Sequence, residues 1–532
     1  MFRDNISKLC RISEQMKKRD LMKCIFLLTV FAIITALNYI YVNRKIDNLS
    51  LTAEEKVSDF QTFYDTIIYD FPNINEVNNV YAIDFKEKYD FYCEKIVQTK
   101  TDFEFYCTMT AIIEDLASYH TGFCFPDYEG IKALNCYNLD TVLDNKNTKA
   151  YTTYWNDVIK ENCEKYKDVS VAEFKYVDGK YVYDSKWSSE KYDDLQGYFI
   201  TSIADNDVNR YVLDNLSIYK IQYDRSNNLA YRRVITLNES VGEKLKIVLE
   251  NQHGERVERE LCVSLEMEMV NTCYPEYEEA DEMVGQNVYY YYDENDDILY
   301  LEINNFQNNE GEKIKEALDG IGSNTQVIID LRDNYGGNPY YAKEYLYPFL
   351  YDETICFEQK WFVSSEKCNR ELSKGVINQI MYETEMVEGG VVYKTSTEYK
   401  GNQEDYRNHI YYLVSKKTAS AADEYIAMVK ANELGTVIGT DTAGEGLGGS
   451  FIVDILENSG WVFTYYPCRA YGVDGENNGV FGTSPDIYIQ QSVDSFIIQR
   501  TLEKEKKDIE SYECRLEWDN VLIETIDIIK EK

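Results

Sequence analysis

The sequence predicts a multidomain protein with a single N-terminal transmembrane helix, a helical N-terminal domain, a β-rich domain and an α/β domain. Its 532 residues exceed what one ordinary hydrophobic core supports. An uncharged apolar run stands near the N-terminus, and further along short β-rich runs give way to strands that alternate with helices. We place the parts at 1–23 (cytoplasmic basic tail), 24–42 (transmembrane signal anchor), 43–170 (helical domain), 171–285 (β-rich domain), 286–500 (α/β domain) and 501–532 (C-terminal helical tail).

The composition excludes some classes of function. A net charge of −38 argues against a nucleic-acid partner, because nucleic-acid-binding proteins need a basic surface. Hydrophobic residues make up 44% of the chain, which is enough for well-formed cores. The 13 cysteines include no C-x-x-C pair, so the sequence has neither a zinc-ribbon nor a dithiol redox motif. We expect neither a metal nor a cofactor.

The apolar run is CIFLLTVFAIITALNYIYV, from Cys24 to Val42. These 19 uncharged residues would span about 28 Å as a helix, close to the thickness of a bilayer core. No small-x-small cleavage site follows, which favours an uncleaved signal anchor over a cleaved signal peptide. A buried core helix is the third interpretation. Residues 1–23 hold seven Lys/Arg against three Asp/Glu, so the positive-inside rule places the N-terminus in the cytoplasm and the later domains outside the cell.

The next two parts differ in periodicity. FEFYCTMTAIIEDLASYH, from Phe103 to His120, has apolar residues at helical spacing, and Gly122 can end the helix. The later runs GYFITSI, YKIQY, RRVITL and KLKIVLE are short and rich in β-forming residues. At the C-terminus, the charged segment 501–532 is typical of a solvated helix and could serve as an interaction tail.

Between these parts, strands and helices alternate. Strands are predicted at 298–306, 325–332, 409–417 and 436–441, and helices at 311–321, 340–350 and 420–432. An irregular insertion, predicted to be β, interrupts them. This alternation predicts βαβ units and a mainly parallel sheet covered by helices. Chemistry in such sheets lies at the carboxyl ends of the strands, where DNYGGN and KKTAS stand.

Ser420 stands where the strand 409–417 passes into the helix 420–432. Serine is a favoured helix cap, and Asp423 three residues later resembles a capping box. Alternatively, Ser420 is a nucleophile, and the free N–H of Ala421 at the positive end of the helix dipole binds the oxyanion. Gly336 and Gly337 could supply a second N–H, or they could simply form a tight turn.

A serine nucleophile needs a base, and the chain has three histidines. His253 lies in a predicted hairpin turn. His409 opens the strand that leads to Ser420 and therefore lies at its far end. His120, at the end of its helix, is left, although a histidine there commonly interacts with the helix dipole instead.

Four segments in order resemble successive motifs of the S41 peptidases, which comprise the C-terminal processing or tail-specific serine peptidases and the core of tricorn protease. The segments are VIIDLRDNYGG, LVSKKTASAADEYIA, VIGTDTAGEGLGG and GENNGVFGTSPDI. The resemblance implies a ClpP/crotonase-like α/β domain, a PDZ-like domain over 171–285, and hydrolysis of polypeptide substrates. LASYHTGF resembles the segment that carries the histidine of tricorn-like members.

The family divides at the position of its base. The tail-specific branch has a lysine 25 residues after the serine, where this chain has Glu445. The tricorn-like branch implies Ser420 as nucleophile, His120 as general base and Glu476 as the residue that orients His120. Glu445 and Glu424 are rival third members.

The prediction is a membrane-anchored, extracellular serine endopeptidase of the cell surface that acts on polypeptides. The replacement of the lysine by Glu445 motivates an alternative, a catalytically inactive S41-like module that binds peptides or acts as a scaffold. In a third reading, the chain is a structural or sensory membrane protein in which Ser420, His120 and Glu476 never meet. The sequence does not specify the substrate or the oligomeric state.

Overall fold

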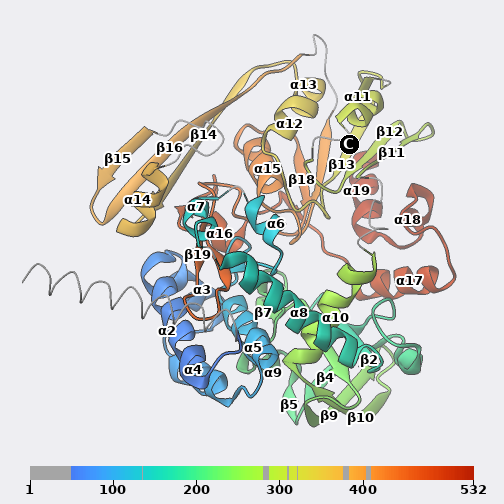
Figure 1. Cartoon of the computed structure of the whole chain (residues 1–532). Coiled ribbons are helices and arrows are strands. Elements are labelled where there is room, and N and C mark those ends of the chain that lie inside the picture. Colours follow the sequence, from blue (N-terminus) through green and yellow to red (C-terminus); the bar gives the residue numbers. More distant parts are fainter. Residues whose placement is uncertain are drawn as a thin grey trace, which may run out of the picture.

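The computed structural model describes residues 49–134, 136–145, 147–279, 287–307, 311–319, 321–374, 383–402 and 409–531. The predicted basic tail and the predicted anchor from Cys24 to Val42 lie outside these ranges. Within the described ranges, we find no helix with the length and hydrophobicity needed to cross a membrane. In Figure 1 the helical and β-rich parts lie together at one side of the molecule, and the α/β part lies at the other.

The N-terminal part is a group of helices around α5, which is apolar on nearly every face and is the most buried of them. Helix α2 begins with a capping box, in which the Thr52 side chain accepts from the Glu55 N–H and the Glu55 side chain accepts from the Thr52 N–H. After α5 the chain forms the short strand β1, Gly122–Phe123. The helices are α2 (Ala53–Asp70), α3 (Ile74–Tyr81), α4 (Tyr89–Gln98), α5 (Asp102–Glu114), α6 (Tyr128–Lys132), α7 (Leu139–Leu143) and α8 (Thr148–Tyr166).

The β-rich part contains a seven-stranded antiparallel sheet in the order β3-β2-β8-β10-β9-β4-β5. Strands β6 and β7 form a separate two-stranded hairpin. The strands are β2 (Val171–Val177), β3 (Lys180–Tyr183), β4 (Tyr198–Ile203), β5 (Asn206–Asp207), β6 (Ile221–Asp224), β7 (Leu229–Arg232), β8 (Val234–Asn238), β9 (Glu243–Asn251) and β10 (Arg256–Val263). The helical elements here are η1 (Glu190–Leu195), α9 (Val208–Asp214) and α10 (Leu265–Glu279). The prediction of a β-rich region is confirmed.

The α/β part is built on a six-stranded sheet in the order β11-β12-β13-β17-β18-β22. All neighbours pair in parallel except β11, which is antiparallel to β12. The predicted alternation of strands and helices is therefore confirmed. The strands are β11 (Val288–Asp293), β12 (Ile298–Ile303), β13 (Gln326–Asp330), β17 (Ile410–Val414), β18 (Thr436–Gly439) and β22 (Ile487–Tyr488), and the helices between them are α11 (Gly311–Asp319), α12 (Tyr340–Tyr345), α13 (Tyr347–Leu350) and α15 (Ala421–Ala431).

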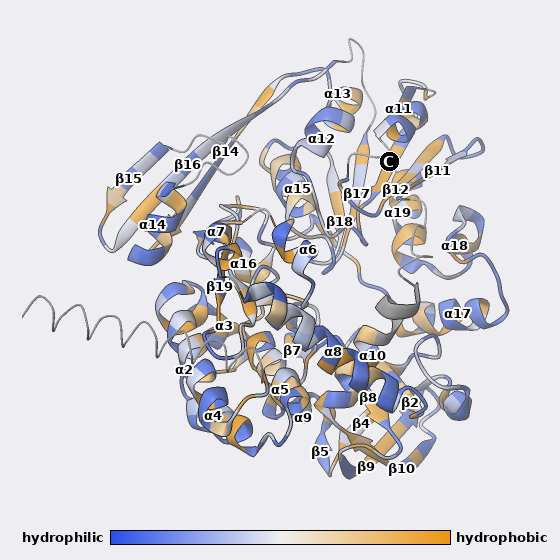
Figure 2. Ribbon diagram, viewed as in Figure 1, coloured by the Kyte–Doolittle hydropathy of each residue, from blue (hydrophilic) through white to orange (hydrophobic). Residues whose placement is uncertain are grey.

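Both faces of this sheet are buried, and successive side chains of each strand pack into different cores. Leu299, Ile329 and Val414 face the main core, which includes the helices between the strands. Tyr300 and Leu413 belong to a second core on the other face. Figure 2 shows β12 and β17 as largely hydrophobic, which is typical of parallel strands covered on two sides.

The second core corrects the prediction of a solvated C-terminal helix. Three helices follow the sheet: α17 (Val493–Lys504), α18 (Tyr512–Trp518) and α19 (Asn520–Glu531). Tyr512, Leu522 and Ile526 are buried against the sheet, although the segment is rich in charge. The charged residues of α19 occupy its outer face, and the apolar ones cover the sheet. The prediction was wrong because it was based on the high charge of the segment and not on the amphipathic spacing of its apolar residues.

The predicted β insertion forms an arm that extends away from the sheet in Figure 1. Its strands are β14 (Ile355–Val363), β15 (Glu383–Val387) and β16 (Gly390–Tyr399), with α14 (Glu366–Lys374) beside them. Strand β21 (Arg469–Ala470) pairs with β14. A further three-stranded sheet has the order β1-β20-β19, with β19 (Ile452–Ile455) and β20 (Val462–Tyr465). Because β1 comes from the helical part, this sheet brings the segment around His120 to the end of the α/β sheet.

Candidate active site

Ser420 lies directly before α15 in a strained conformation. Its backbone angles are φ 52° and ψ −122°, a region that non-glycine residues rarely adopt. Its side chain makes no capping hydrogen bond, and its N–H donates to the Gly444 carbonyl at 3.1 Å. The interpretation of Ser420 as a side-chain helix cap is therefore wrong. Strain of this kind costs about 1–3 kcal/mol and is typical of functional positions.

The backbone around Ser420 leaves two N–H groups for an oxyanion. The Ala421 N–H stands at the start of α15 and has no acceptor within the described part of the chain. The Gly336 N–H donates to Asn334 Oδ1 at 2.8 Å, so this group is already occupied. The neighbouring Gly337 N–H makes no hydrogen bond to the described residues. Of the two predicted glycine donors, Gly337 is thus the one that remains available.

Gly336 has a different function, which is to let two loops approach each other. Its φ is +94°, and a Cβ atom added there would lie 2.9 Å from both the Ala421 nitrogen and the Ser420 Cβ. Only a glycine fits this position without displacing the serine or the first turn of α15.

His120 is held between the helical part and the α/β part. Its backbone N–H donates to Glu445 Oε2, and its Nδ1 lies 3.6 Å from the same oxygen. The imidazole ring contacts the rings of Phe451 and Tyr466, at centroid distances of 5.4 and 5.6 Å. The preceding residue, Tyr119, donates from its hydroxyl to the Lys416 carbonyl at 2.9 Å. The histidine segment is therefore attached directly to the loop that leads to Ser420.

Glu445 joins the two halves of the site. Its side chain is 1% exposed, and its Oε1 accepts a 2.5 Å hydrogen bond from the Ser118 hydroxyl. Gly444, the residue before it, accepts the N–H of Ser420. The same two-residue segment thus contacts the serine through its backbone and the histidine through its carboxylate.

Burial shifts the pKa of both titratable groups in this pair. Desolvation and the positive charge of Lys220 lower the pKa of His120 to about 4, so the imidazole is neutral at pH 7. Desolvation raises the pKa of Glu445 to about 7, against the opposing effect of the hydrogen bonds from Ser118 and the backbone. Perturbed pairs of this kind are common at catalytic sites.

The structure corrects the assignment of Glu476 as the residue that orients His120. Glu476 binds Arg225 through both carboxylate oxygens, one of them 3.2 Å from Nη1. Arg225 also binds Asp441 at 2.8 Å. The family resemblance pointed to Glu476, but its carboxylate forms an ion pair with Arg225 of the β6–β7 hairpin.

For the remaining predicted residues, no contact with His120 is found in the described part of the chain. Glu424 accepts from Gln359 Nε2 at 2.7 Å, and burial raises its pKa to about 7. His409 Nε2 lies 2.9 Å from Thr436 Oγ1, and His253 is exposed in its hairpin turn. Of the two rival third members, Glu445 is the residue that contacts the histidine.

Asp423 has a structural function that the sequence analysis missed. It is fully buried, and it does not cap Ser420. Its carboxylate accepts hydrogen bonds of 2.5 to 3.1 Å from Thr442 Oγ1, Thr483 Oγ1, Asn478 Nδ2 and the Gly446 N–H. These bonds hold the loop on either side of Glu445 against α15. Its position three residues after Ser420 suggested only a capping box.

We predict that Gly336→Ala impairs catalysis far more than it impairs folding. The added methyl group would displace Ser420 or the Ala421 N–H, and loss of one oxyanion donor lowers the rate about 10²–10³-fold. The measurement is hydrolysis of a fluorescently labelled unfolded protein, with thermal unfolding as the check on folding. Gly197→Ala is the matched control, because Gly197 also has a positive φ but nothing lies within 4 Å of its added Cβ. Equal activity of the two variants would contradict the prediction.

The comparison with curated proteins found no match. Among solved structures, the chain is similar to mature CPAF complexed with lactacystin, with 13% identity over 87% of this chain and 99% of that chain and a TM-score of 0.49. It is also similar to the photosystem II D1 C-terminal processing protease (12% identity, 82% and 94% covered, TM-score 0.33) and to tricorn protease (14%, 90% and 37%, 0.33).

The family comparison is more direct, because the model of peptidase family S41 matches residues 297–489. The match spans β12 to β22 and includes Ser420, Glu445 and both glycines. The chain therefore carries a peptidase family S41 domain, the catalytic domain of a serine-type peptidase.

Proposed function

We propose that the chain is a serine endopeptidase in which Ser420 is the nucleophile, His120 the general base and Glu445 the residue that orients the histidine. The observation that carries this proposal is the hydrogen bond from the His120 N–H to Glu445, whose Oε2 also lies 3.6 Å from His120 Nδ1, a distance beyond a hydrogen bond. Glu445 occupies the position where the tail-specific branch has its lysine. Glu445 cannot act as a neutral amine base like that lysine, but its carboxylate can support a histidine that comes from another part of the chain.

The proposed reaction uses this arrangement in the following way. With Nδ1 facing Glu445, His120 has Nε2 available to accept the proton of Ser420 as the hydroxyl attacks the peptide carbonyl. The imidazolium that forms is stabilised by the Glu445 carboxylate, and the N–H groups of Ala421 and Gly337 bind the oxyanion. His120 then gives the proton to the leaving amine. Water hydrolyses the acyl-enzyme with His120 again as base.

The alternative of an inactive peptide-binding module was motivated by the missing lysine. Glu445 now has a specific contact that accounts for its presence, and the side chain of the strained Ser420 does not cap α15. Both observations favour an enzyme over a binding module.

We further propose that the segment from Cys24 to Val42 anchors the enzyme, with the catalytic domain outside the cell. The support is the uncharged 19-residue length and the basic flank. Extracellular or membrane-tethered polypeptides would then be its substrates. The test is extraction of membranes with alkaline carbonate, followed by protease treatment of intact cells. The protein should remain in the membrane and be digested from outside; release by carbonate or protection from the protease would contradict the proposal.

The pH dependence of hydrolysis tests the assignment of the three catalytic residues. The active form has a neutral His120 beside an ionised Glu445. As the pH falls, this pair takes up its first proton with a pKa of about 7, the value for Glu445. We therefore expect kcat/KM of the full-length enzyme to rise with pH and to level off above about 7.

The variant Glu445→Gln removes that titration. We expect a plateau lower by about 10²–10⁴-fold and an acid limb that moves down towards the pKa of His120, about 4. Glu476→Gln is the matched control and should keep the limb near 7, while Ser420→Ala gives the blank. A normal profile for Glu445→Gln together with a loss of activity in Glu476→Gln would restore the original assignment. Equal hydrolysis by wild type and Ser420→Ala would refute the peptidase.

A further inference from the structure

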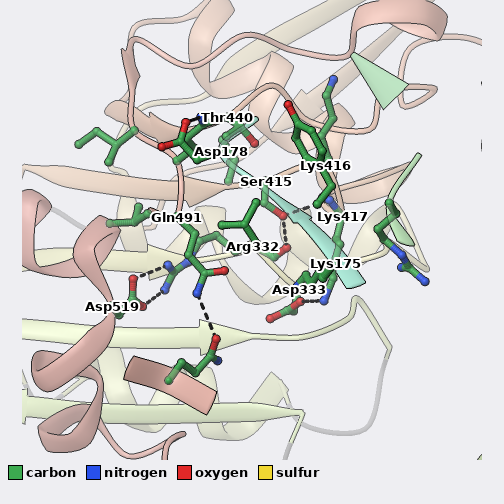
Figure 3. A pocket seen from close by; sticks show the side chains of 18 of the residues that line it. Lys175, Asp178, Arg332, Asp333, Ser415, Lys416, Lys417, Thr440, Gln491 and Asp519 are labelled. Atoms are coloured by element: carbon green, nitrogen blue, oxygen red, sulfur yellow. Dashed lines mark hydrogen bonds and ion pairs between the residues drawn. The ribbon is translucent and has the colours of Figure 1, made fainter. Parts of the chain in front are cut away.

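A cavity of about 440 Å³ lies where the three parts of the protein meet. Its walls come from β2 and the residues after β3, from the loops after β13 and β17, and from the C-terminal helices α17 and α18. Figure 3 shows Lys175, Asp333 and Lys417 close together in this cavity. Neither Ser420 nor His120 lines it. Its volume is in the range of pockets that bind small ligands or parts of larger ones.

The lining is unusually basic for so acidic a protein. It includes eight Lys/Arg and six Asp/Glu side chains. Six of the eight cations are neutralised or bound: four have short ion pairs, one has a longer ion pair, and one donates to backbone carbonyls. These are Arg332 with Asp519, Lys417 with Asp333, Arg500 with Asp184, Arg515 with Glu302, Lys186 with Glu503, and Lys416 with the Thr442 and Phe481 carbonyls.

The two other cations, Lys175 and Arg233, have no carboxylate within 4 Å in the described part of the chain. Both line the cavity, and their backbones are neighbours, because Lys175 pairs across β2 and β8 with Val234, the residue that follows Arg233. Burial and the positive charges of Lys417 and Arg500 lower the pKa of Lys175 to about 8. The nearby Glu173 makes no ion pair with either cation in the described part of the chain: its side chain is bonded to Asn271, and burial raises its pKa to about 8 although Arg233 and Lys175 act in the opposite direction.

Aromatic side chains also line the cavity, beside glutamine and aliphatic side chains. Trp187, Tyr231, Tyr335 and Trp518 all contribute to the lining. A bare inorganic ion would leave these rings uncovered, whereas a peptide could cover them with its backbone and methylene groups while presenting carboxylates to the two cations. We propose that this cavity binds an acidic segment of a polypeptide, with Lys175 and Arg233 as the groups that hold its carboxylates.

The site would be separate from the catalytic centre but close to it. Tyr119 lines the cavity and directly precedes His120, and its hydroxyl bonds to Gln222 and to the Lys416 carbonyl. A bound segment would therefore contact the loops that carry the base and the nucleophile. Binding itself does not depend on hydrolysis, so the proposal can be tested independently of the proposed function.

The test is isothermal titration calorimetry on the full-length Ser420→Ala protein. The probe is a peptide with three consecutive glutamates, acetylated and amidated so that it has no terminal charge, and a triple-glutamine peptide is the comparison. We expect only the glutamate peptide to bind, and Lys175→Gln or Arg233→Gln to weaken its affinity by about tenfold or more. Lys244→Gln is the matched control, because Lys244 is an exposed lysine of the same sheet paired with Glu260, and it should leave the affinity unchanged.

Several results would overturn the proposal. These are no binding of the glutamate peptide, equal binding of the glutamine peptide, or equal weakening by Lys244→Gln. Inorganic phosphate serves as the competing probe, and displacement of the peptide by phosphate at equal affinity would also refute a peptide site. Arg233 is exposed, so Arg233→Gln should fold normally. If Lys175→Gln does not fold, the affinity of Arg233→Gln for the glutamate peptide still tests the proposal.

Discussion

The candidate active site depends on one contact between distant parts of the chain, the carboxylate of Glu445 against the N–H and imidazole of His120. The two residues are 325 positions apart in the sequence. The proposed nucleophile and oxyanion donors belong to the α/β part, but the proposed base comes from a loop after α5 in the helical part. The centre can therefore form only when these two parts pack against each other.

Several buried interactions fix that packing. Strand β1 pairs with β20, so the residues directly after His120 are part of a sheet that belongs mainly to the α/β region. Asp59 of α2 accepts the N–H groups of Asn458 and Ser459 at 3.0 and 2.7 Å, and the Trp155 indole donates to the Ser459 carbonyl at 2.9 Å. Removing one partner from such a buried contact leaves the other unsatisfied, which is costly. These contacts thus position the histidine, although none of them touches it.

The β-rich part supports the same loop from the other side. Buried Arg232 is paired with Asp115, at the end of α5, and Lys220 donates to the Ser118 carbonyl. The β6–β7 hairpin also carries Arg225, which binds Asp441 and Glu476 of the α/β part. The three parts therefore all contact the residues around His120 and Glu445. An acidic peptide in the basic cavity would lie at the same junction.

Much of this could be predicted from the sequence. The strands and helices of the α/β part have clear periodicity, and four motifs in order identified the family and Ser420. The choice between Glu445 and Glu476 could not be made in this way, because both stand in the expected motifs and only the folded hairpin brings Arg225 to Glu476. The packing of α19 against the sheet was not predicted, because the many charged residues of this segment indicated a solvated helix. The function of Asp423 was hidden because its partners lie 19 to 60 residues away.

The most direct test of the central claim is labelling of the full-length protein with a fluorophosphonate probe, comparing wild type, Ser420→Ala and His120→Ala. If His120 activates Ser420, the wild type will be labelled, Ser420→Ala will not, and His120→Ala will react slower by about 10²-fold or more. Undiminished labelling of His120→Ala would show that another group is the base. Absence of labelling in the folded wild type would contradict an activated serine.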